Sequence, residues 1–240
     1  MRYVGEELEL FEHARNWKTY FARMIKPFVK GRVLDVGCGM GVNSTYLYGP
    51  EVASYTFLEP DPRLLERIPD KVGAPALSNA ERKVGTTEDM KGRRFDTILY
   101  LDVIEHIENS REELQRAFDL LGPGGHLIIL VPAYNYLFSE FDRAIGHFRR
   151  YNKRSLRREI PPGAEHRFLK YLDSVGLMAS LGNKWFLKQA IPDEAQIRLW
   201  DRSMIPASTI LDRLLFHSMG RSLLGVFQKP DLNDDKASPP

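Results

Sequence analysis

The chain has 240 residues, 43% of them hydrophobic, which suits one large α/β domain with a sizeable core. Its formal net charge of +2 argues against a large nucleic-acid interface and against attraction to acidic membranes. Cys38 is the one cysteine, so an internal disulfide is excluded and a reducing compartment such as the cytoplasm fits. The start is acidic and no run of about twenty apolar residues occurs, so we expect neither a signal peptide nor a membrane span.

The first expected element is an amphipathic helix over residues 6–28. Apolar side chains recur at helical spacing from Phe11 to Phe28, and Pro27 favours an end at that point. Such a helix is expected to pack on the domain, so residues 1–30 are interpreted as an N-terminal cap helix.

Residues 32–36 form an apolar strand, and a helix is expected over residues 41–48. Between them, glycine stands at alternate positions: Gly37, Gly39 and Gly41. Glycine lets the backbone turn sharply and approach a ligand that a Cβ atom would exclude. Free N–H groups at the start of the helix face the same place. The pattern predicts the nucleotide-binding end of a doubly wound α/β fold; a purely structural turn is the alternative.

The third glycine of the dinucleotide fingerprint is missing, because Val42 stands at its position. This argues against a nucleotide-dependent oxidoreductase, which is kept as an alternative. The spacing, preceded by Asp35, resembles motif I of the class I S-adenosylmethionine-dependent methyltransferases. By this resemblance the cofactor site includes Asp35, Gly37, Gly39 and Gly41.

A second strand over residues 54–58 ends in Glu59 and Pro60. A carboxylate there can accept hydrogen bonds from both hydroxyls of a ribose. Glu59 follows Asp35 by 24 residues, close to the spacing of one βαβ unit. We therefore assign Glu59 and Pro60 to the cofactor site, with a solvated loop acid as the alternative.

A short helix over residues 62–68 and a third strand over residues 83–85 follow. The resemblance places adenine-facing residues just after this strand. Because Thr86 stands where the family usually has an acid, the adenine contact is expected at Thr87, at Glu88 or at a backbone N–H group.

Residues 95–101 form a near-continuous apolar strand, as expected for a strand covered on both faces. The segment that follows resembles the family's motif after strand four, which passes the sulfonium and faces the acceptor. The resemblance assigns Leu101, Asp102 and Val103 to the cofactor. His106 follows at helical spacing from Asp102.

A helix is expected over residues 110–121, with Ser110 as N-cap and Glu113 as its capping-box partner. Residues 121–126 predict a tight, glycine-rich turn into a fifth strand over residues 127–131. Such a turn is typical of the same family.

Five strands alternating with helices imply a parallel sheet with right-handed crossovers. Together with the resemblance over residues 31–133, this predicts the class I methyltransferase fold: a doubly wound, mostly parallel, seven-stranded sheet. The methyltransferase domain is expected over residues 31–230 and a disordered tail over residues 231–240.

A Gly-His-x-Arg-Arg-Tyr stretch ends at Tyr151 and resembles one found in bacterial methyltransferases of the type 11/12 kind, linked with cell-envelope sugar or lipid pathways. We assign Tyr134, Arg149, Arg150 and Tyr151 to the acceptor site. The arginines suit a phosphate or carboxylate. Two arginines at a solvated helix start are the alternative.

The remaining expected elements are a helix over 153–159, a strand over 166–171, helices over 173–189 and 194–219, and a last strand over 222–228. In the family the last two strands form an antiparallel hairpin, so residues 173–221 are interpreted as a helical insertion or lid. Aromatic and basic residues interleave in this insertion. Core packing within the lid is one interpretation, and a groove or a membrane-surface face is the other.

The expected activity is methyl transfer from S-adenosylmethionine to a small-molecule, sugar-linked or lipid-linked acceptor, by O-methylation. A base with a pKa near neutral helps methyl transfer to an oxygen acceptor, whereas a nitrogen or carbon acceptor, the alternative, requires neither candidate base. His106 is the first candidate and His147 the second; structural histidines are the alternative. We expect no metal, no nucleic-acid partner, and a cytoplasmic protein with peripheral contact at the inner face of the membrane as an option. A non-catalytic S-adenosylmethionine-binding protein is also an alternative.

Overall fold

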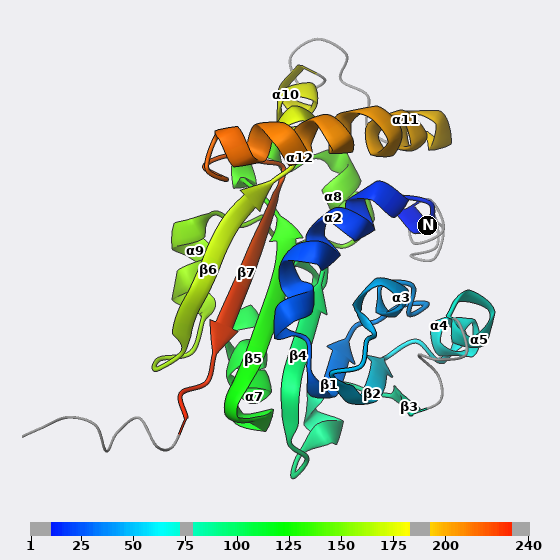
Figure 1. Cartoon of the computed structure of the whole chain (residues 1–240), viewed down its shortest axis with the longest axis vertical. Helices are drawn as coiled ribbons and strands as arrows, with labels where there is room; N and C mark the ends of the chain where they lie inside the picture. The colour runs from blue at the N-terminus through cyan, green and yellow to red at the C-terminus, as the bar shows by residue number, and fades with distance from the viewer. Residues whose placement is uncertain (1–10, 73–78, 183–192, 232–240) are drawn as a thin grey trace, which may run out of the picture.

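The computed structural model describes residues 11–72, 79–182 and 193–231. Its centre is a seven-stranded sheet in the order β3-β2-β1-β4-β5-β7-β6 (Figure 1). The strands are β1 (Gly31–Val36), β2 (Val52–Glu59), β3 (Ala80–Val84), β4 (Phe95–Leu101), β5 (Leu121–Pro132), β6 (Glu165–Leu172) and β7 (Ser222–Gln228). Only β7 runs antiparallel, to both β5 and β6. The predicted seven-stranded, mostly parallel α/β sheet with a terminal hairpin is therefore confirmed.

The helices are short and lie on both faces of the sheet and across one end of it. They are α2 (Arg15–Ile25), α3 (Ser44–Leu47), α4 (Pro62–Glu66), α5 (Ile68–Lys71), α7 (Ser110–Leu120), α8 (Glu140–Ala144), α9 (Lys153–Glu159), α10 (Ser174–Gly182), α11 (Glu194–Leu199) and α12 (Ile205–Leu214). A π-helical turn, Trp200–Met204, joins α11 to α12. Short 3-10 turns occur at Lys26–Phe28, Thr87–Met90, Ile104–His106 and Asn135–Leu137.

Two hydrophobic cores hold the layers together, one on each face of the sheet. Trp17, Phe21 and Ile25 of α2 belong to the first core, with side chains from β1, β4 and β5. The helices α7 and α9 pack in the second core. Ile98 and Leu99, neighbours on β4, face opposite cores and are both fully buried, which explains the unbroken apolar pattern of that strand.

The N-terminal helix is not continuous, contrary to the prediction over residues 6–28. Ala14 interrupts it with a ψ of 67°, and α2 begins at Arg15. The carboxylate of Asp201 accepts hydrogen bonds from the N–H groups of Asn16 and Trp17, at 3.1 and 2.9 Å. A distant acid therefore caps α2, and residues 6–10 lie outside the described part of the chain.

The predicted cap of α7 is also wrong. Asn109, rather than Ser110, is the N-cap, and its side chain accepts from the N–H of Glu112. Glu113 does not reach back to the cap, because its carboxylate lies inside the protein and accepts hydrogen bonds from Thr87 and Tyr100. Glu113 is thus buried and bonded to two hydroxyl groups instead of capping the helix.

Three boundaries differ from the prediction because glycines or left-handed residues redirect the backbone. Residues 41–43 form a turn, so α3 begins only at Ser44. The strand β5 begins at Leu121, which pairs with Phe95, and the glycine-rich segment is an irregularity within this strand rather than a turn before it. The helix α12 ends at Leu214, because Phe216 adopts a φ of 51°.

Other elements follow the prediction closely. Strand β4, helix α9 and strand β7 have the predicted bounds. The predicted helix over 62–68 is divided into α4 and α5. The predicted third strand begins earlier, at Ala80, and ends before Gly85.

The lid formed by α10, α11 and α12 crosses the end of the sheet at which the parallel strands finish (Figure 1). Asp212 of α12 fixes it, accepting from the N–H groups of Asp173 and Ser174 and from the hydroxyl of Tyr20 on α2. Residues 183–192 of the predicted insertion, and residues 232–240 of the predicted tail, lie outside the described part. No helix within the described ranges is both long and apolar enough to cross a bilayer.

Candidate active site

A cavity of about 740 Å³ opens where β1, β2, β4 and β5 end. Loops at this edge form the ligand crevice of open α/β sheets, and the volume is typical of small-molecule sites. The predicted site residues that line it are Gly37, Gly39, Glu59, Pro60, Glu88, Leu101, Asp102, Val103, His106, His147 and Arg150. The predicted site residues that do not line it are Asp35, Gly41, Thr87, Tyr134, Arg149 and Tyr151.

The glycine loop brings its backbone against the loop that follows β4. Gly37 has a φ of +61°, and a Cβ atom built on it would lie 2.9 Å from both methyl groups of Val103. A larger side chain would therefore close this part of the cavity. Gly41 has a different role, because its Cβ would instead meet the ring of Phe57 at 3.0 Å, in the core behind the loop.

Asp35 lies beneath the glycine loop, away from the cavity. It is 2% exposed and accepts a 2.9 Å hydrogen bond from the hydroxyl of Tyr55. Burial raises the pKa of Asp35 to about 7, and the nearby Glu59 contributes in the same direction, while the Tyr55 hydrogen bond opposes them. Asp35 is thus hydrogen-bonded to β2 through Tyr55 and does not line the cavity.

The carboxylate of Glu59 is held by two backbone N–H groups at the cavity wall. Its Oε2 accepts from Gly39 at 2.9 Å and its Oε1 accepts from Asp61 at 3.1 Å. Burial raises the pKa of Glu59, and these two hydrogen bonds counteract part of that rise. The group is fixed in place, and each oxygen keeps a lone pair for a ligand hydroxyl.

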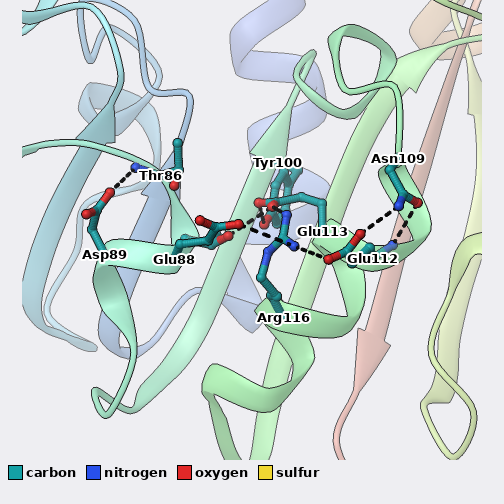
Figure 2. A network of polar contacts seen from close by, with 9 residues as sticks. Thr86, Glu88, Asp89, Tyr100, Asn109, Glu112, Glu113 and Arg116 are labelled. Carbon is teal, nitrogen blue, oxygen red and sulfur yellow. Dashed lines mark hydrogen bonds and ion pairs between the residues drawn. The ribbon is translucent and has the colours of Figure 1, made fainter.

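A polar network links the turn after β3 to helix α7 (Figure 2), and Glu88, Glu113 and Arg116 of this network line the cavity. Glu113 accepts from the hydroxyls of Thr87 and Tyr100 at 2.9 and 2.6 Å and pairs with Arg116 at 2.9 Å. Arg116 lies 3.6 Å from Glu88, which lines the cavity. The hydroxyl of Thr87 is therefore committed to the protein, and Glu88 is the one of the two predicted adenine contacts that faces the cavity.

Asp102 occupies a left-handed backbone conformation at the end of β4, with a φ of 58°. Its N–H donates to the carbonyl oxygen of Leu130 at 2.9 Å, which locks this turn. Its carboxylate faces the cavity. Loss of contact with bulk water raises the pKa of Asp102 to about 6. The charges of His147, Lys18 and Arg221 oppose this rise. Such strain in a non-glycine residue is typical of functional sites.

His106 and His147 meet edge to face, with ring centroids 4.5 Å apart. Nδ1 of His147 lies 2.9 Å from Oδ1 of Asp142, and Nε2 lies 3.9 Å from Oε1 of the buried Glu105. His106 is hydrogen-bonded to the backbone of Ile145. Burial lowers the pKa of His106 to about 4, with a further contribution from His147.

Arg150 and Asp142 form a two-bond ion pair, with Nε and Nη2 each 2.8 Å from a carboxylate oxygen. Burial by itself would raise the pKa of Asp142, but hydrogen bonds from His147, Arg150 and Ser139 hold it well below its usual range. Of the four predicted acceptor residues, Arg150 is the one that lines the cavity, and its guanidinium is engaged with Asp142.

The other three predicted acceptor residues lie behind the cavity wall. Arg149 donates to the carbonyl oxygen of Glu108 at 2.6 Å. Tyr151 is 1% exposed. Tyr134 stacks on Tyr171 with centroids 4.8 Å apart. These contacts hold the segment that carries His147 against neighbouring parts of the protein.

Lys18, Trp200 and Arg221 also line the cavity, although sequence reasoning did not select them. Burial lowers the pKa of Lys18 to about 8. The guanidinium of Arg221 lies 5.6 Å from the ring of Trp200. Lys18 interrupts an apolar stripe of its helix, which is a signal the sequence offered; Trp200 and Arg221 follow no local pattern.

The sheet order, the glycine loop after β1 and the acid at the end of β2 together define the class I methyltransferase fold. A family profile described as a methyltransferase domain matches residues 9–172. The chain therefore belongs to the S-adenosylmethionine-dependent methyltransferases, whose cofactor is S-adenosylmethionine.

The chain is similar to a ubiquinone biosynthesis O-methyltransferase of Azorhizobium caulinodans, with 29% identity over 170 residues. That alignment covers 69% of this chain and 62% of the relative, so the chain spans less than two thirds of its length. Other similar proteins of known structure share the fold at low sequence identity. A methyltransferase bound to the activator Trm112 of Haloferax volcanii has a TM-score of 0.63 and 17% identity, covering 94% of this chain and 93% of its own. The N-methyltransferase NodS of Bradyrhizobium japonicum, solved with S-adenosylhomocysteine, has a TM-score of 0.56 and 16% identity, covering 92% of this chain and 88% of its own.

The cavity fits this cofactor by its own geometry. The close approach of Gly37 to Val103 leaves a cradle that a Cβ atom would fill. The carboxylate of Glu59 stands at the same wall, fixed by Gly39 and Asp61. A nucleoside with free ribose hydroxyls meets suitable acceptors there.

Proposed function

We propose that the protein transfers a methyl group from S-adenosylmethionine to an oxygen of a small-molecule, sugar-linked or lipid-linked acceptor. The observation that supports this most directly is a single cavity lined by both Glu59 and the His106–His147 pair. Asp102 and Val103 also line it, next to the glycine loop. The cofactor wall and a pair of groups able to handle a proton thus share one cavity.

In this proposal the cofactor side of the cavity consists of fixed groups. Glu59 would hold the ribose, and the backbone of Gly37 and Gly39 would lie against the amino-acid part. Asp102 and Glu88 would face the remaining polar atoms. Further contacts are assigned to Pro60, Leu101 and Val103. The cofactor supplies a methyl group on a positively charged sulfur, already activated for transfer.

The chain then has two tasks, to orient the acceptor oxygen and to take up its proton. His106 and His147 line the cavity, and hydrogen bonds to Ile145 and Asp142 fix their rings. His106 is the first candidate for handling the proton and His147 the second. The lid and α2 cover the site and would limit entry of water.

Aromatic and basic groups on the cavity wall favour an organic acceptor that carries negative charge. Phe11 and Trp200 meet edge to face at 6.1 Å, and Arg221 lies over Trp200. A guanidinium beside an aromatic ring suits a carboxylate or phosphate attached to a flat or apolar group. The name of the Azorhizobium relative refers to O-methylation, which supports an oxygen acceptor.

A cytoplasmic protein with peripheral membrane contact is part of the proposal. The lid exposes Ile210, Leu214 and Phe216, whose side chains are 66%, 69% and 89% exposed. Arg213 lies among them in the sequence. Apolar side chains next to a positive charge are typical of helices that rest on a membrane surface.

The test uses methyl-labelled S-adenosylmethionine, the purified protein and an extract of the host. Label is counted in organic, aqueous small-molecule, protein and nucleic-acid fractions, with Glu59→Ala as the blank. We expect label in the organic or small-molecule fraction. Label in nucleic acid would contradict the proposed acceptor class. S-adenosylhomocysteine binding with no label in any fraction would favour a non-catalytic binding protein, and binding of a nicotinamide nucleotide instead would favour an oxidoreductase.

A further inference from the structure

Three potential metal ligands from two separate segments meet at one wall of the cavity. Glu105 and His106 belong to the turn after β4, and His147 follows α8. One ligand atom from each of the three lies within 4.8 Å of the other two. All three residues also line the cavity. The group is therefore enclosed by protein on one side and open to a bound ligand on the other.

Each histidine ring has a hydrogen-bond partner that fixes its orientation. Nδ1 of His147 is hydrogen-bonded to the carboxylate of Asp142, which Arg150 and Ser139 hold in turn. This leaves Nε2 of His147 directed toward Glu105, 3.9 Å from Oε1. His106 is hydrogen-bonded to the backbone of Ile145. Metal-binding histidines almost always show this arrangement, with the outer nitrogen on a carboxylate or a carbonyl.

The donor set indicates which ions would bind. Two imidazoles and one carboxylate form a known set for catalytic Zn²⁺, which keeps its fourth position for water or substrate. Around a tetrahedral Zn²⁺ the ligand atoms stand about 3.3 Å apart, so small side-chain rotations would bring these three into place. Imidazole ligands make hard ions such as Mg²⁺ a poorer match.

We propose that Glu105, His106 and His147 bind a divalent transition-metal ion, with Zn²⁺ as the best match, and that its open position takes the acceptor oxygen. This role rests on the proposed methyl transfer. It replaces the proton-handling role given to His106 and His147 under the proposed function, and it differs from the sequence-based expectation of no metal. The acceptor's O–H bond breaks and its proton leaves to water in the cavity. The new O–CH₃ bond forms as the S–CH₃ bond of the cofactor breaks. Coordination would make the hydroxyl more acidic, so no strong protein base is required.

The test is direct metal binding by the untagged full-length protein after treatment with EDTA and dialysis. ZnCl₂ is titrated by calorimetry, and bound metal is counted by mass spectrometry after gel filtration. MnCl₂ and MgCl₂ serve as comparison ions. We expect one Zn²⁺ per chain, and an affinity loss of at least about 100-fold in both His106→Gln and His147→Gln.

His166→Gln is the matched control, because His166 is an exposed histidine on β6 and does not line the cavity. It should bind Zn²⁺ like the unchanged protein. Glu105→Gln keeps the shape of a buried side chain while removing its charge, and it should also lose affinity. Circular dichroism verifies that each variant is folded.

Two results would overturn the proposal: no Zn²⁺ bound by the unchanged protein, or unchanged binding in His106→Gln and His147→Gln. S-adenosylhomocysteine binding is measured on the same samples. Intact cofactor binding without metal binding would reject the metal site and leave the proposed methyl transfer standing. Metal binding without cofactor binding would support the metal site and reject the proposed methyl transfer.

Discussion

Arg150 donates two hydrogen bonds of 2.8 Å to the carboxylate of Asp142, and Nδ1 of His147 is hydrogen-bonded to the same carboxylate. Within the Gly-His-x-Arg-Arg-Tyr stretch, the second arginine therefore positions the histidine at the cavity wall, because both contact Asp142. Arg149, its neighbour in sequence, instead donates to the carbonyl oxygen of Glu108. Two adjacent arginines thus have separate roles.

Because Arg150 is paired with a buried carboxylate, we expect Arg150→Met to lower the free energy of unfolding much more than Arg149→Met. Arg150→Met would leave the Asp142 carboxylate, 1% exposed, without its main cation. Removing one partner of a buried ion pair costs about 3–5 kcal/mol, so the free energy of unfolding should fall by about 3 kcal/mol. Arg149→Met is the control and should cost about 1 kcal/mol or less. Urea unfolding measures both, and equal losses would contradict the distinct roles.

The position of Glu59 at the cavity wall predicts that its carboxylate contributes to the affinity for the cofactor. Glu59→Gln keeps one acceptor oxygen but replaces the other with an NH₂ donor, so it cannot accept hydrogen bonds at both positions. We expect the affinity for S-adenosylhomocysteine, measured by calorimetry, to fall at least about 10-fold, since a hydrogen bond to a charged group contributes about 1.5–3 kcal/mol. Glu66→Gln, an exposed acid on α4, is the control and should bind normally. An unchanged affinity in Glu59→Gln would remove Glu59 from the site.

The raised pKa of the buried Asp35 carboxyl group predicts that the free energy of unfolding depends on pH. Its pKa rises from 3.8 to about 7 on folding, chiefly through burial, so the folded state favours the protonated form. This stabilising contribution is complete below about pH 4, declines between pH 4 and 7, and is lost above pH 7. Asp35→Asn has no such loss. From pH 4 to pH 8 it should therefore gain stability relative to the unchanged protein, by about 4 kcal/mol at most.

Urea unfolding at several pH values tests this prediction, with the free energies of the two proteins compared at each pH. Tyr55→Phe is a useful companion, because it removes the hydrogen bond that favours the charged carboxylate. It should raise the folded-state pKa of Asp35 further, so the decline in stability should continue to higher pH. Parallel curves for Asp35→Asn and the unchanged protein would show that Asp35 does not titrate as described.

Local sequence patterns predicted the sheet well because strands and glycine turns depend on neighbouring residues. The apolar run of β4 and the glycines after β1 belong to this class, and so does the carboxylate of Glu59 at the end of β2. The predicted cap at Ser110 failed because Glu113 is drawn inward by Thr87 and Tyr100, which lie far from it in sequence.

The side of the cavity that holds the histidines was harder to predict because its contacts are non-local. Asp201 caps α2 across 184 residues, and Arg221 reaches the cavity from the start of β7. The sequence did select His106 and His147, but their proximity depends on the fold of two loops. The same fold turns Tyr134, Arg149 and Tyr151 away from the cavity, which no spacing rule could show.

The lid surface gives the last prediction. Leu214 and Phe216 are 69% and 89% exposed, so replacing both with serine should change the free energy of unfolding by less than about 0.5 kcal/mol. If the lid rests on a membrane, the same double variant should lose much of its co-sedimentation with anionic vesicles, because apolar contact and positive charge act together there. Val84→Ser on β3 is the control, since Val84 is 50% exposed and lies outside the lid. Failure of the unchanged protein to bind vesicles of any composition would make the lid a simple cover over the cavity, and the acceptor would then be sought among water-soluble compounds.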